Sequence, residues 1–298
     1  MKRGRITAVL LLLVTTAIWG IAGPVIKGTL SYFPPFTFLF FRFGLVFIFA
    51  LPLYLWYLGL HKLRAKDFFI LTIYGLMATT INLSLIFVGY DKTTALEGTL
   101  ISSLSPMFIV LLGVFFLREK ITKLEIAGLA LVVIGSIATV FEPLFFGNGM
   151  AISHTFGNSL ILLADLEWAF FVLFTKKSFD KYPPLLVILH SSIVAFLSFI
   201  PLALVENNLS LPNFQYLISN TDALYGVIYM AFLSYFVAYF LYEVAMSKIE
   251  ISRGSVFAYL QPIFAAPLAV FWLEEKLTIP FLAGAAVIAL GVVLSEWK

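Results

Sequence analysis

Cysteine is absent from this sequence of 298 residues. Its absence excludes a disulfide framework, a thiol nucleophile and a cysteine-based metal site. Charged side chains are also scarce, because Asp, Glu, Lys and Arg together make up 12% of the residues, against roughly 25% in a soluble domain. The chain therefore lacks the polar faces that a water-soluble helical protein places on its surface.

Motifs of nucleotide binding and hydrolysis are missing as well. The chain contains no Walker loop, no Gly-x-Ser-x-Gly and no His-Glu-x-x-His, so neither ATP hydrolysis nor acyl or metal-dependent hydrolysis has a motif to support it. Its histidines, His61, His154 and His190, show no metal-ligand spacing. The net charge of +3 does not indicate a nucleic-acid partner. We therefore expect no enzymatic activity, no metal and no cofactor.

What the sequence has in abundance is apolar residues. They account for 61% of the chain, and the mean hydropathy is +1.03. Many occur in runs of about 20 residues, the length of a helix that crosses a bilayer. An all-α integral membrane protein is therefore predicted. The ten expected transmembrane helices cover residues 6–26, 36–57, 68–88, 96–117, 124–141, 157–174, 185–205, 223–243, 255–273 and 280–296.

Basic residues between the expected spans fall almost entirely into alternate connections. Only Lys27, Lys92 and Lys276 fall into the other set. Because cytoplasmic loops carry the excess of Lys and Arg, this sorting predicts that both termini are cytoplasmic. It also supports the number of spans, since one span more or fewer would scramble the sorting downstream. We expect the protein to lie in the plasma membrane, the inner membrane of the cell.

The chain contains an internal repeat. Two long stretches match at a constant offset of 156, which pairs Pro106 with Pro262 and Glu119 with Glu275. Each copy consists of an apolar run, a short charged turn and a second apolar run, the pattern of a helical hairpin in a membrane. A duplicated hairpin of this kind indicates a protein built from two related halves.

The repeat extends upstream into the rest of each half. An offset of 149 pairs Trp19 with Trp168 and Lys27 with Lys176. Each half thus contains five helices, and because five is odd, the second half enters the membrane from the opposite side. Such inverted five-helix repeats allow two halves to rock about a central site. The predicted halves of this single membrane domain are residues 1–147 and 148–298.

Short motifs along the chain follow an order found in one group of transporters. The segment Ile-Trp-Gly-Ile-Ala-Gly-Pro-Val-Ile-Lys-Gly begins at residue 18, Arg42 lies inside the second span, and a proline interrupts each hairpin at Pro106 and Pro262. These features resemble the drug/metabolite transporter superfamily, in particular its ten-helix EamA-type branch, over nearly the whole chain. One departure is Ile21-Ala22, where such sequences often carry small polar residues.

The resemblance implies a secondary transporter of small organic solutes that works by alternating access around a central cavity. Its expected task is the export of amino acids or related metabolites. Without a nucleotide motif, the energy would come from the solute gradient or from protons or sodium ions. One alternative is an intramembrane enzyme, which turnover of a lipid or peptide would reveal. The other is a channel-like facilitator, which a very fast flux would reveal.

Charged residues inside the spans are costly and therefore informative. Arg42 lies about 10 Å into its span at 1.5 Å per residue, either as a carboxylate contact in the pathway or as a structural contact between helices. Asp165 and Glu167 lie near the middle of the sixth span, but residues two apart do not share a helix face. We expect Asp165, on the face of Trp168, to line the cavity or to bond another helix as a neutral acid. Glu167 is expected to contact a neighbouring helix.

Aromatic and helix-breaking residues complete the candidate site. Trp19 and Trp168 lie several residues inside their spans, where a symmetric pair would either wall a cavity or fill the core. Pro106 and Pro262 free backbone carbonyls for a substrate or bend their helices for packing alone. The other candidates, which would contact either a substrate or a neighbouring helix, are Asn82, Tyr239, Tyr259 and Gln261.

Four acidic residues lie near the ends of the expected spans. We interpret Glu97, Glu119, Glu243 and Glu275 as solvated or structural, because carboxylates at span ends can reach water or helix termini. None of the four is assigned a role in binding.

Overall fold

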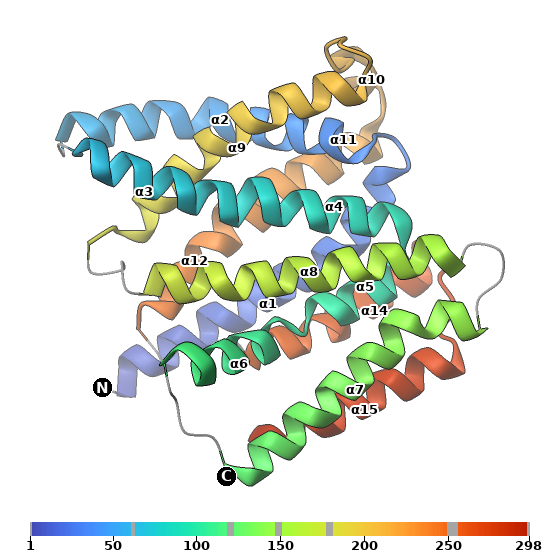
Figure 1. Cartoon of the computed structure of the whole chain (residues 1–298). Coiled ribbons are helices and arrows are strands. Elements are labelled where there is room, and N and C mark those ends of the chain that lie inside the picture. Colours follow the sequence, from blue (N-terminus) through green and yellow to red (C-terminus); the bar gives the residue numbers. More distant parts are fainter. Residues whose placement is uncertain are drawn as a thin grey trace.

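The computed structural model describes residues 2–60, 63–117, 122–146, 151–176, 181–248 and 256–296, and their regular secondary structure is entirely helical. Figure 1 shows the helices running roughly side by side in one bundle. The predicted all-α architecture is therefore confirmed for the part of the chain that the structure describes.

Five long helical segments make up the first half, and two of them are interrupted. The third segment changes helix type partway, and the fourth is broken by a turn. In chain order they are α1 (Lys2–Leu30), α2 (Pro35–Leu60), α3 (Ala65–Gly75) with η1 (Leu76–Ile81) and α4 (Asn82–Lys92), α5 (Ala95–Ser102) with α6 (Ser105–Leu117), and α7 (Lys123–Phe146).

The second half repeats this plan, with one short extra helix in a connection. Its third and fourth segments are again composite. In chain order they are α8 (Ala151–Lys176), α9 (Pro184–Glu206), the short α10 (Phe214–Ser219), α11 (Thr221–Ile228) with η2 (Tyr229–Val237) and α12 (Ala238–Met246), η3 (Val256–Leu260) with α14 (Gln261–Phe271), and α15 (Ile279–Glu296).

The ten predicted spans all correspond to apolar helical segments. Among the described residues, seven segments are long and apolar enough to cross a membrane, and three shorter apolar helices occupy the remaining places. The helix α10 was not predicted, because its six residues are too few to show an apolar run.

Both predicted proline breaks occur. A proline ring clashes with the carbonyl four residues earlier and lacks the N–H that would bond to it. Four residues before Pro106 is Ser102, where α5 ends. Four residues before Pro262 is Ala258, which lies in the 3-10 helix η3 just before α14 begins. The fourth helix of each half is therefore divided in two.

The third helix of each half contains a π-helical section. These are η1 in the first half and η2 in the second. π-helical turns are rare and occur often at functional sites, because they displace the regular hydrogen bonds. The repeat is thus visible in the backbone, at positions where the sequence alone shows no signal for it.

The two halves interlock. α4 packs on α8, and α12 packs on α1, so the third helix of each half lies against the first helix of the other. α2 pairs with α9 and α7 with α15, and Figure 1 shows these pairs at opposite edges of the bundle. Each of the two edge pairs joins equivalent helices, as expected of an inverted repeat. The space around α1 and α8 is therefore shared by both halves.

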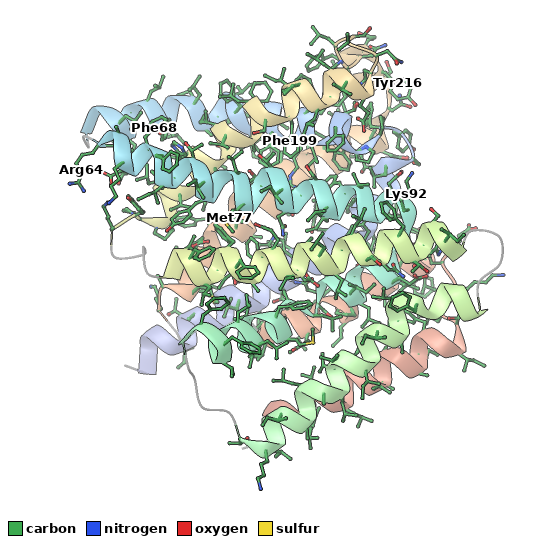
Figure 2. All side chains as sticks on the ribbon, viewed as in Figure 1. Arg64, Phe68, Met77, Lys92, Phe199 and Tyr216 are labelled. Atoms are coloured by element: carbon green, nitrogen blue, oxygen red, sulfur yellow. The ribbon has the colours of Figure 1, made fainter. Side chains whose placement is uncertain are left out.

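The bundle has two distinct ends, which we name after labelled residues. Figure 2 shows Arg64 at one end and Lys92 at the other. The first, here called the Arg64 end, also holds the N-terminus in Figure 1; the second is called the Lys92 end. Because most basic residues belong to connections at the Arg64 end, this end is predicted to face the cytoplasm.

Candidate functional site

A cavity of about 160 Å³ lies between the two halves. One face of α1 runs along it, because Leu12, Thr16, Trp19, Gly23 and Ile26 line it at intervals of three and four residues. At 1.5 Å per residue this face is about 20 Å long. The cavity therefore follows the middle part of α1.

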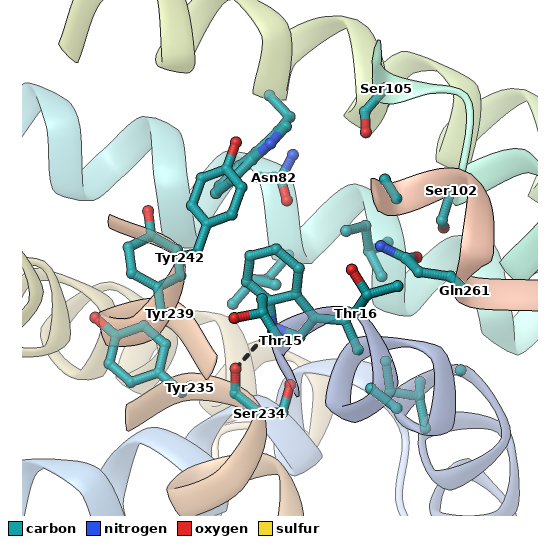
Figure 3. Close-up of a pocket in the computed structure, with 18 of the residues that line it drawn as sticks. Thr15, Thr16, Asn82, Ser102, Ser105, Ser234, Tyr235, Tyr239, Tyr242 and Gln261 are labelled. Atoms are coloured by element: carbon teal, nitrogen blue, oxygen red, sulfur yellow. Dashed lines mark hydrogen bonds between the residues drawn. The ribbon is translucent and has the colours of Figure 1, made fainter. Parts of the chain in front are cut away.

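The remaining walls come from both halves. Asn82 of α4 belongs to the first half, whereas Asp165 of α8 belongs to the second. Figure 3 shows Tyr235, Tyr239 and Tyr242, from η2 and α12, following one another along one wall. A molecule in the cavity would therefore touch both halves at once, as alternating access requires.

Arg42 of α2 lines the cavity and is only 3% exposed. Its guanidinium carbon lies 5.2 Å from the ring centre of Phe43, 5.7 Å from that of Phe87 and 5.8 Å from that of Tyr235. These aromatic faces attract the cation electrostatically. Its Nε and Nη1 atoms are buried without a hydrogen bond, and no ion pair among the described residues includes it. Two donor atoms of Arg42 thus have no hydrogen-bond partner in the protein.

Asp165 of α8 lines the same cavity and is 6% exposed. Its Oδ2 atom is buried without a hydrogen-bond partner. Asp165 and Arg42 form no ion pair with each other, so each keeps unsatisfied polar atoms. Glu167, two residues further along, lies outside the cavity lining and faces Asn82 without a well-formed hydrogen bond.

Aromatic rings from both halves form one wall. The ring centres of Trp19 and Trp168 lie 6.1 Å apart in an edge-to-face arrangement, a favourable geometry for aromatic pairs. Tyr242 lies 5.1 Å from Trp19 and 5.7 Å from Trp168. The Trp19 indole donates from Nε1 to the carbonyl oxygen of Ser234 at 2.9 Å. Because Ser234 belongs to η2, this bond ties α1 to the π-helical section.

Three of the mid-span polar candidates reach the cavity. Asn82 donates from Nδ2 to the carbonyl oxygen of Ala164 at 2.8 Å, a bond that joins α4 to α8. Gln261, the first residue of α14, is 8% exposed. The Tyr239 hydroxyl is buried without a hydrogen-bond partner. Asn82 therefore has a structural contact in addition to its place in the lining, whereas the Tyr239 hydroxyl has no partner in the protein.

Tyr259 is the fourth polar candidate, and the structure does not place it in the cavity lining. Tyr259 belongs to the 3-10 helix η3, which has three residues per turn. Ala258 and Gln261, the first residue of α14, are three residues apart and therefore share one face, and both line the cavity. Tyr259 is rotated away from that face. Neither helix-breaking proline lines the cavity, although the residue before each one does.

Several cavity residues, among them Tyr235 and Tyr242, were not predicted from the sequence, and one acid was misjudged. Tyr235 and Tyr242 flank Tyr239 at spacings of four and three, a stripe on one helical face that the sequence itself contains. Glu243 was expected to be solvated or structural near a span end. It is 1% exposed, and its Oε2 atom has no hydrogen-bond partner. The solvated interpretation is therefore wrong, because α12 continues to Met246 and turns this carboxylate inward.

The composition of the cavity favours binding rather than conversion of a small molecule. It presents one cation, one carboxyl group, hydroxyls and aromatic faces to a ligand. Among the described residues, no group of three or more His, Asp or Glu lies close enough to hold a metal ion.

Comparison with known proteins identifies the fold. The model of the EamA-like transporter family matches residues 6–141 and 155–297, once in each half. This chain belongs to the EamA-like transporter family. It is therefore a transporter and an integral membrane protein, and the family resemblance of its motifs is confirmed.

Three relatives are distant in sequence but align with this chain over nearly their whole length. An uncharacterized transporter of Archaeoglobus fulgidus is 25% identical over 95% of this chain and 96% of its own. Proteins named as probable amino-acid metabolite efflux pumps in Salmonella typhimurium and Escherichia coli are 25% and 24% identical, each over 96% of this chain and 93% of its own.

A solved crystal structure has the same fold as this EamA-like chain. The two superpose with a TM-score of 0.64 at 17% identity, covering 97% of this chain and 95% of the other. At that identity the likeness shows the fold alone. The ten-segment arrangement is thus one that an experimentally determined protein also adopts.

Proposed function

We propose that this EamA-like transporter is a secondary transporter that exports amino acids or related metabolites. The single observation that carries the proposal is the pair Arg42 and Asp165, which line one small cavity with unsatisfied polar atoms and form no ion pair. A buried charge without a partner is costly. Ligand groups of opposite charge would relieve that cost when they bind.

An α-amino acid matches both groups. Its carboxylate accepts two hydrogen bonds from a guanidinium in the bidentate geometry that Arg favours. Its ammonium is attracted both to a carboxylate and to aromatic faces, and Trp19 and Trp168 supply such faces here. A cavity of about 160 Å³ is close in size to the roughly 150 Å³ cavity that holds one benzene molecule. The site thus fits a small amino acid or a metabolite of similar size.

Alternating access follows from the inverted repeat. If the two halves exchange conformations, the cavity opens first at one end and then at the other, with the same residues in contact with the solute. The energy comes from the solute gradient or from a coupled proton or sodium ion. Export agrees with the names of the Salmonella and Escherichia relatives, which are called probable amino-acid metabolite efflux pumps.

The test is counterflow in liposomes that contain the purified protein. Each vesicle is loaded with an amino acid, and uptake of the labelled compound is compared with that of an amine lacking the carboxylate and an acid lacking the ammonium. We expect the zwitterion to exchange fastest. Equal exchange of all three, or of none, would contradict the proposed substrate class.

Arg42→Gln sharpens this test, because it removes the charge but retains hydrogen-bonding groups. We expect the preference for carboxylate-bearing compounds to disappear. Arg64→Gln is the matched control, since its side chain is 74% exposed at one end of the bundle. Retained preference in Arg42→Gln would show that Arg42 has a structural role only.

A further inference from the structure

The turn between α4 and α5 lies at the Lys92 end, beside the cavity residues Gly23 and Tyr90. Tyr90 of α4 and Thr99 of α5 are joined by a hydrogen bond of 3.2 Å between their hydroxyls. Both lie against Gly23 of α1, where an added Cβ would be only 2.8 Å from the Tyr90 hydroxyl. Gly23 and Tyr90 line the cavity. Because only a glycine fits here, no solute passes between α1 and this hairpin.

A cation of α1 holds the α4 side of the turn. Lys27 donates from Nζ to the carbonyl oxygens of Tyr90 at 3.0 Å and Asp91 at 3.3 Å. These carbonyls are at the C-terminal end of α4, where no following helical N–H is available to them. A helix C-terminus carries partial negative charge, so the ammonium is favourably placed.

An anion from the other half holds the α5 side of the turn. Glu275 accepts hydrogen bonds from the backbone nitrogens of Ala95 at 2.6 Å and Leu96 at 2.8 Å. The next nitrogen, that of Glu97, donates to the Thr94 hydroxyl at 3.1 Å. The first N–H groups of α5 are therefore satisfied, and the carboxylate lies at the positive end of the helix dipole.

Glu275 is fixed in place by its own surroundings. It lies in the connection from α14 to α15, and its backbone nitrogen donates to the carbonyl oxygen of Ala269 at 3.0 Å. Ala269 packs with Ala95 and Leu96 in a small apolar cluster. The contact therefore joins the first half to the second through both a charge-assisted pair of hydrogen bonds and buried apolar surface.

We propose that Lys27 and Glu275 form a latch that holds the α4–α5 turn over the cavity, and that release of Glu275 opens the Lys92 end. The latch rests on the proposed alternating-access transport. The repeat supports it, because the sequence mates of these residues, Lys176 and Glu119, are the same residue types. The side chains of these two mates lie outside the described residues.

The test measures access to the cavity directly and needs no substrate. Thr16→Cys places a thiol in the cavity lining, in a chain with no other cysteine. The rate of reaction with a membrane-impermeant maleimide is measured from each face of the membrane. Exposed Ser31 and Lys66, each replaced by Cys in a separate protein, show which face the Lys92 end and the Arg64 end occupy.

Glu275→Gln is the test variant in the Thr16→Cys protein. The two α5 nitrogens donate to different carboxylate oxygens of Glu275. In Gln one of these oxygens is replaced by an NH2 group, which only donates, so one of the two hydrogen bonds is lost. Losing a hydrogen bond to a charged group shifts a two-state equilibrium about tenfold or more. We expect the thiol to react about tenfold faster from the face of the Lys92 end, with no increase from the other face.

Two controls separate a latch from general loosening. Glu206→Gln removes the same kind of cap, because Glu206 accepts from the nitrogens of Phe36 at 3.1 Å and Thr37 at 2.6 Å at the start of α2. Glu274→Gln changes the exposed neighbour of Glu275. Neither should raise the labelling rate.

Equal rates in Glu275→Gln and Glu274→Gln, or an equal increase in Glu206→Gln, would overturn the latch. If Glu275→Gln does not yield folded protein, Glu275→Asp replaces it. Its shorter side chain keeps the charge but cannot span both nitrogens, so the same comparison applies. Labelling does not depend on any solute, so the two proposals can be tested separately. The latch proposal can be contradicted while amino-acid exchange is observed. It can also be supported when no amino acid is exchanged.

Discussion

At the scale of single residues, this protein keeps polar groups unsatisfied where a stable fold would pair them. The Nε and Nη1 atoms of Arg42 have no hydrogen bond, and neither does the Tyr239 hydroxyl, although both side chains line the cavity. Outside the cavity lining, Glu167 and Glu243 also keep buried carboxylate oxygens without a hydrogen bond, whereas several other buried polar groups are paired. His190, for example, has the Tyr54 hydroxyl 2.6 Å from Nδ1 and the Thr72 hydroxyl 3.0 Å from Nε2. Arg42 and Tyr239 thus leave polar atoms unpaired in the cavity lining, at a cost to the stability of the fold.

Asp165→Asn tests whether this residue couples transport to protons. The change keeps size and hydrogen bonding but removes titration. If Asp165 carries the proton, the variant should still exchange solute between equal concentrations, yet lose accumulation driven by a pH gradient, because it can no longer load and release a proton. Both modes are measured in liposomes.

Glu167→Gln serves as the matched control, because Glu167 lies two residues away and outside the cavity lining. It should accumulate solute normally. Accumulation that survives in Asp165→Asn would exclude Asp165 as the proton carrier.

At the scale of helices, close contacts through glycine hold α7 and α15 together. An added Cβ at Gly291 would meet the carbonyl oxygen of Gly128 at 2.7 Å, and one at Gly135 would meet Ile288 at 2.8 Å. In a bilayer no hydrophobic effect drives helices together, so small residues that allow close approach supply the packing energy. Gly128 lies next to Gly291, and Gly135 lies next to Gly284. The two helices are equivalent in the repeat and run antiparallel, so the first glycine of one helix meets the second glycine of the other.

Gly291→Val is expected to destabilise the α7–α15 pair by about 1–3 kcal/mol, the usual cost of overpacking. An added Cβ at Gly291 would lie 2.7 Å from the carbonyl oxygen of Gly128 and 2.8 Å from the backbone nitrogen of Val132. Thermal unfolding in detergent measures the loss. Gly59→Val is the control, because nothing lies within 4 Å of the Cβ position at Gly59, and its unfolding temperature should not fall. An equal fall in both variants would contradict the packing argument.

At each end of the bundle, an aspartate in the first turn of a helix accepts a hydrogen bond from a tyrosine hydroxyl, but only one of these aspartates also forms ion pairs. Asp67, in the first turn of α3, accepts from the Tyr182 hydroxyl at 2.8 Å and from Lys181. Asp222, in the first turn of α11, accepts from the Tyr32 hydroxyl at 3.3 Å. The hydrogen bond to the Asp67 carboxylate raises the pKa of Lys181. Asp67 thus forms ion pairs with Arg64 and Lys181, whereas Asp222 forms none with the described residues.

At the scale of the whole molecule, orientation is the first property to test. The distribution of basic residues predicts that the Lys92 end faces out. A cysteine at Ser153, whose hydroxyl lies 3.5 Å from the carbonyl oxygen of Lys92, should react with an impermeant reagent added outside intact cells. A cysteine at exposed Lys66 should react only after the membrane is opened. The reverse pattern would invert the predicted topology.

The inverted repeat also predicts the effect of changing Glu119, the sequence mate of Glu275. If the two halves exchange roles during transport, Glu119→Gln should favour opening at the Arg64 end, opposite to Glu275→Gln. Labelling of Thr16→Cys from both faces measures this preference. Faster labelling from the Lys92 end in both variants would show that the two glutamates do not have mirrored roles.

Much of the architecture could be predicted because bilayers impose strict rules on sequence. Apolar runs of about 20 residues located the ten segments, and the prolines Pro106 and Pro262 located two breaks, since proline cannot continue the hydrogen-bond ladder. The repeat predicted two inverted halves, and the family model matches once in each. Asp165 and Arg42 were candidates because charges are rare in membranes.

What the sequence by itself determined about this protein is therefore its class: a ten-segment, duplicated membrane transporter. The tertiary structure alone decided which side chains share the cavity, because that depends on helix rotation and packing. A 3-10 turn rotates Tyr259 away from the cavity, and the continuation of α12 turns Glu243 inward. The contact between Glu275 and the start of α5 spans 180 residues, and no local pattern encodes a partner so distant in the chain.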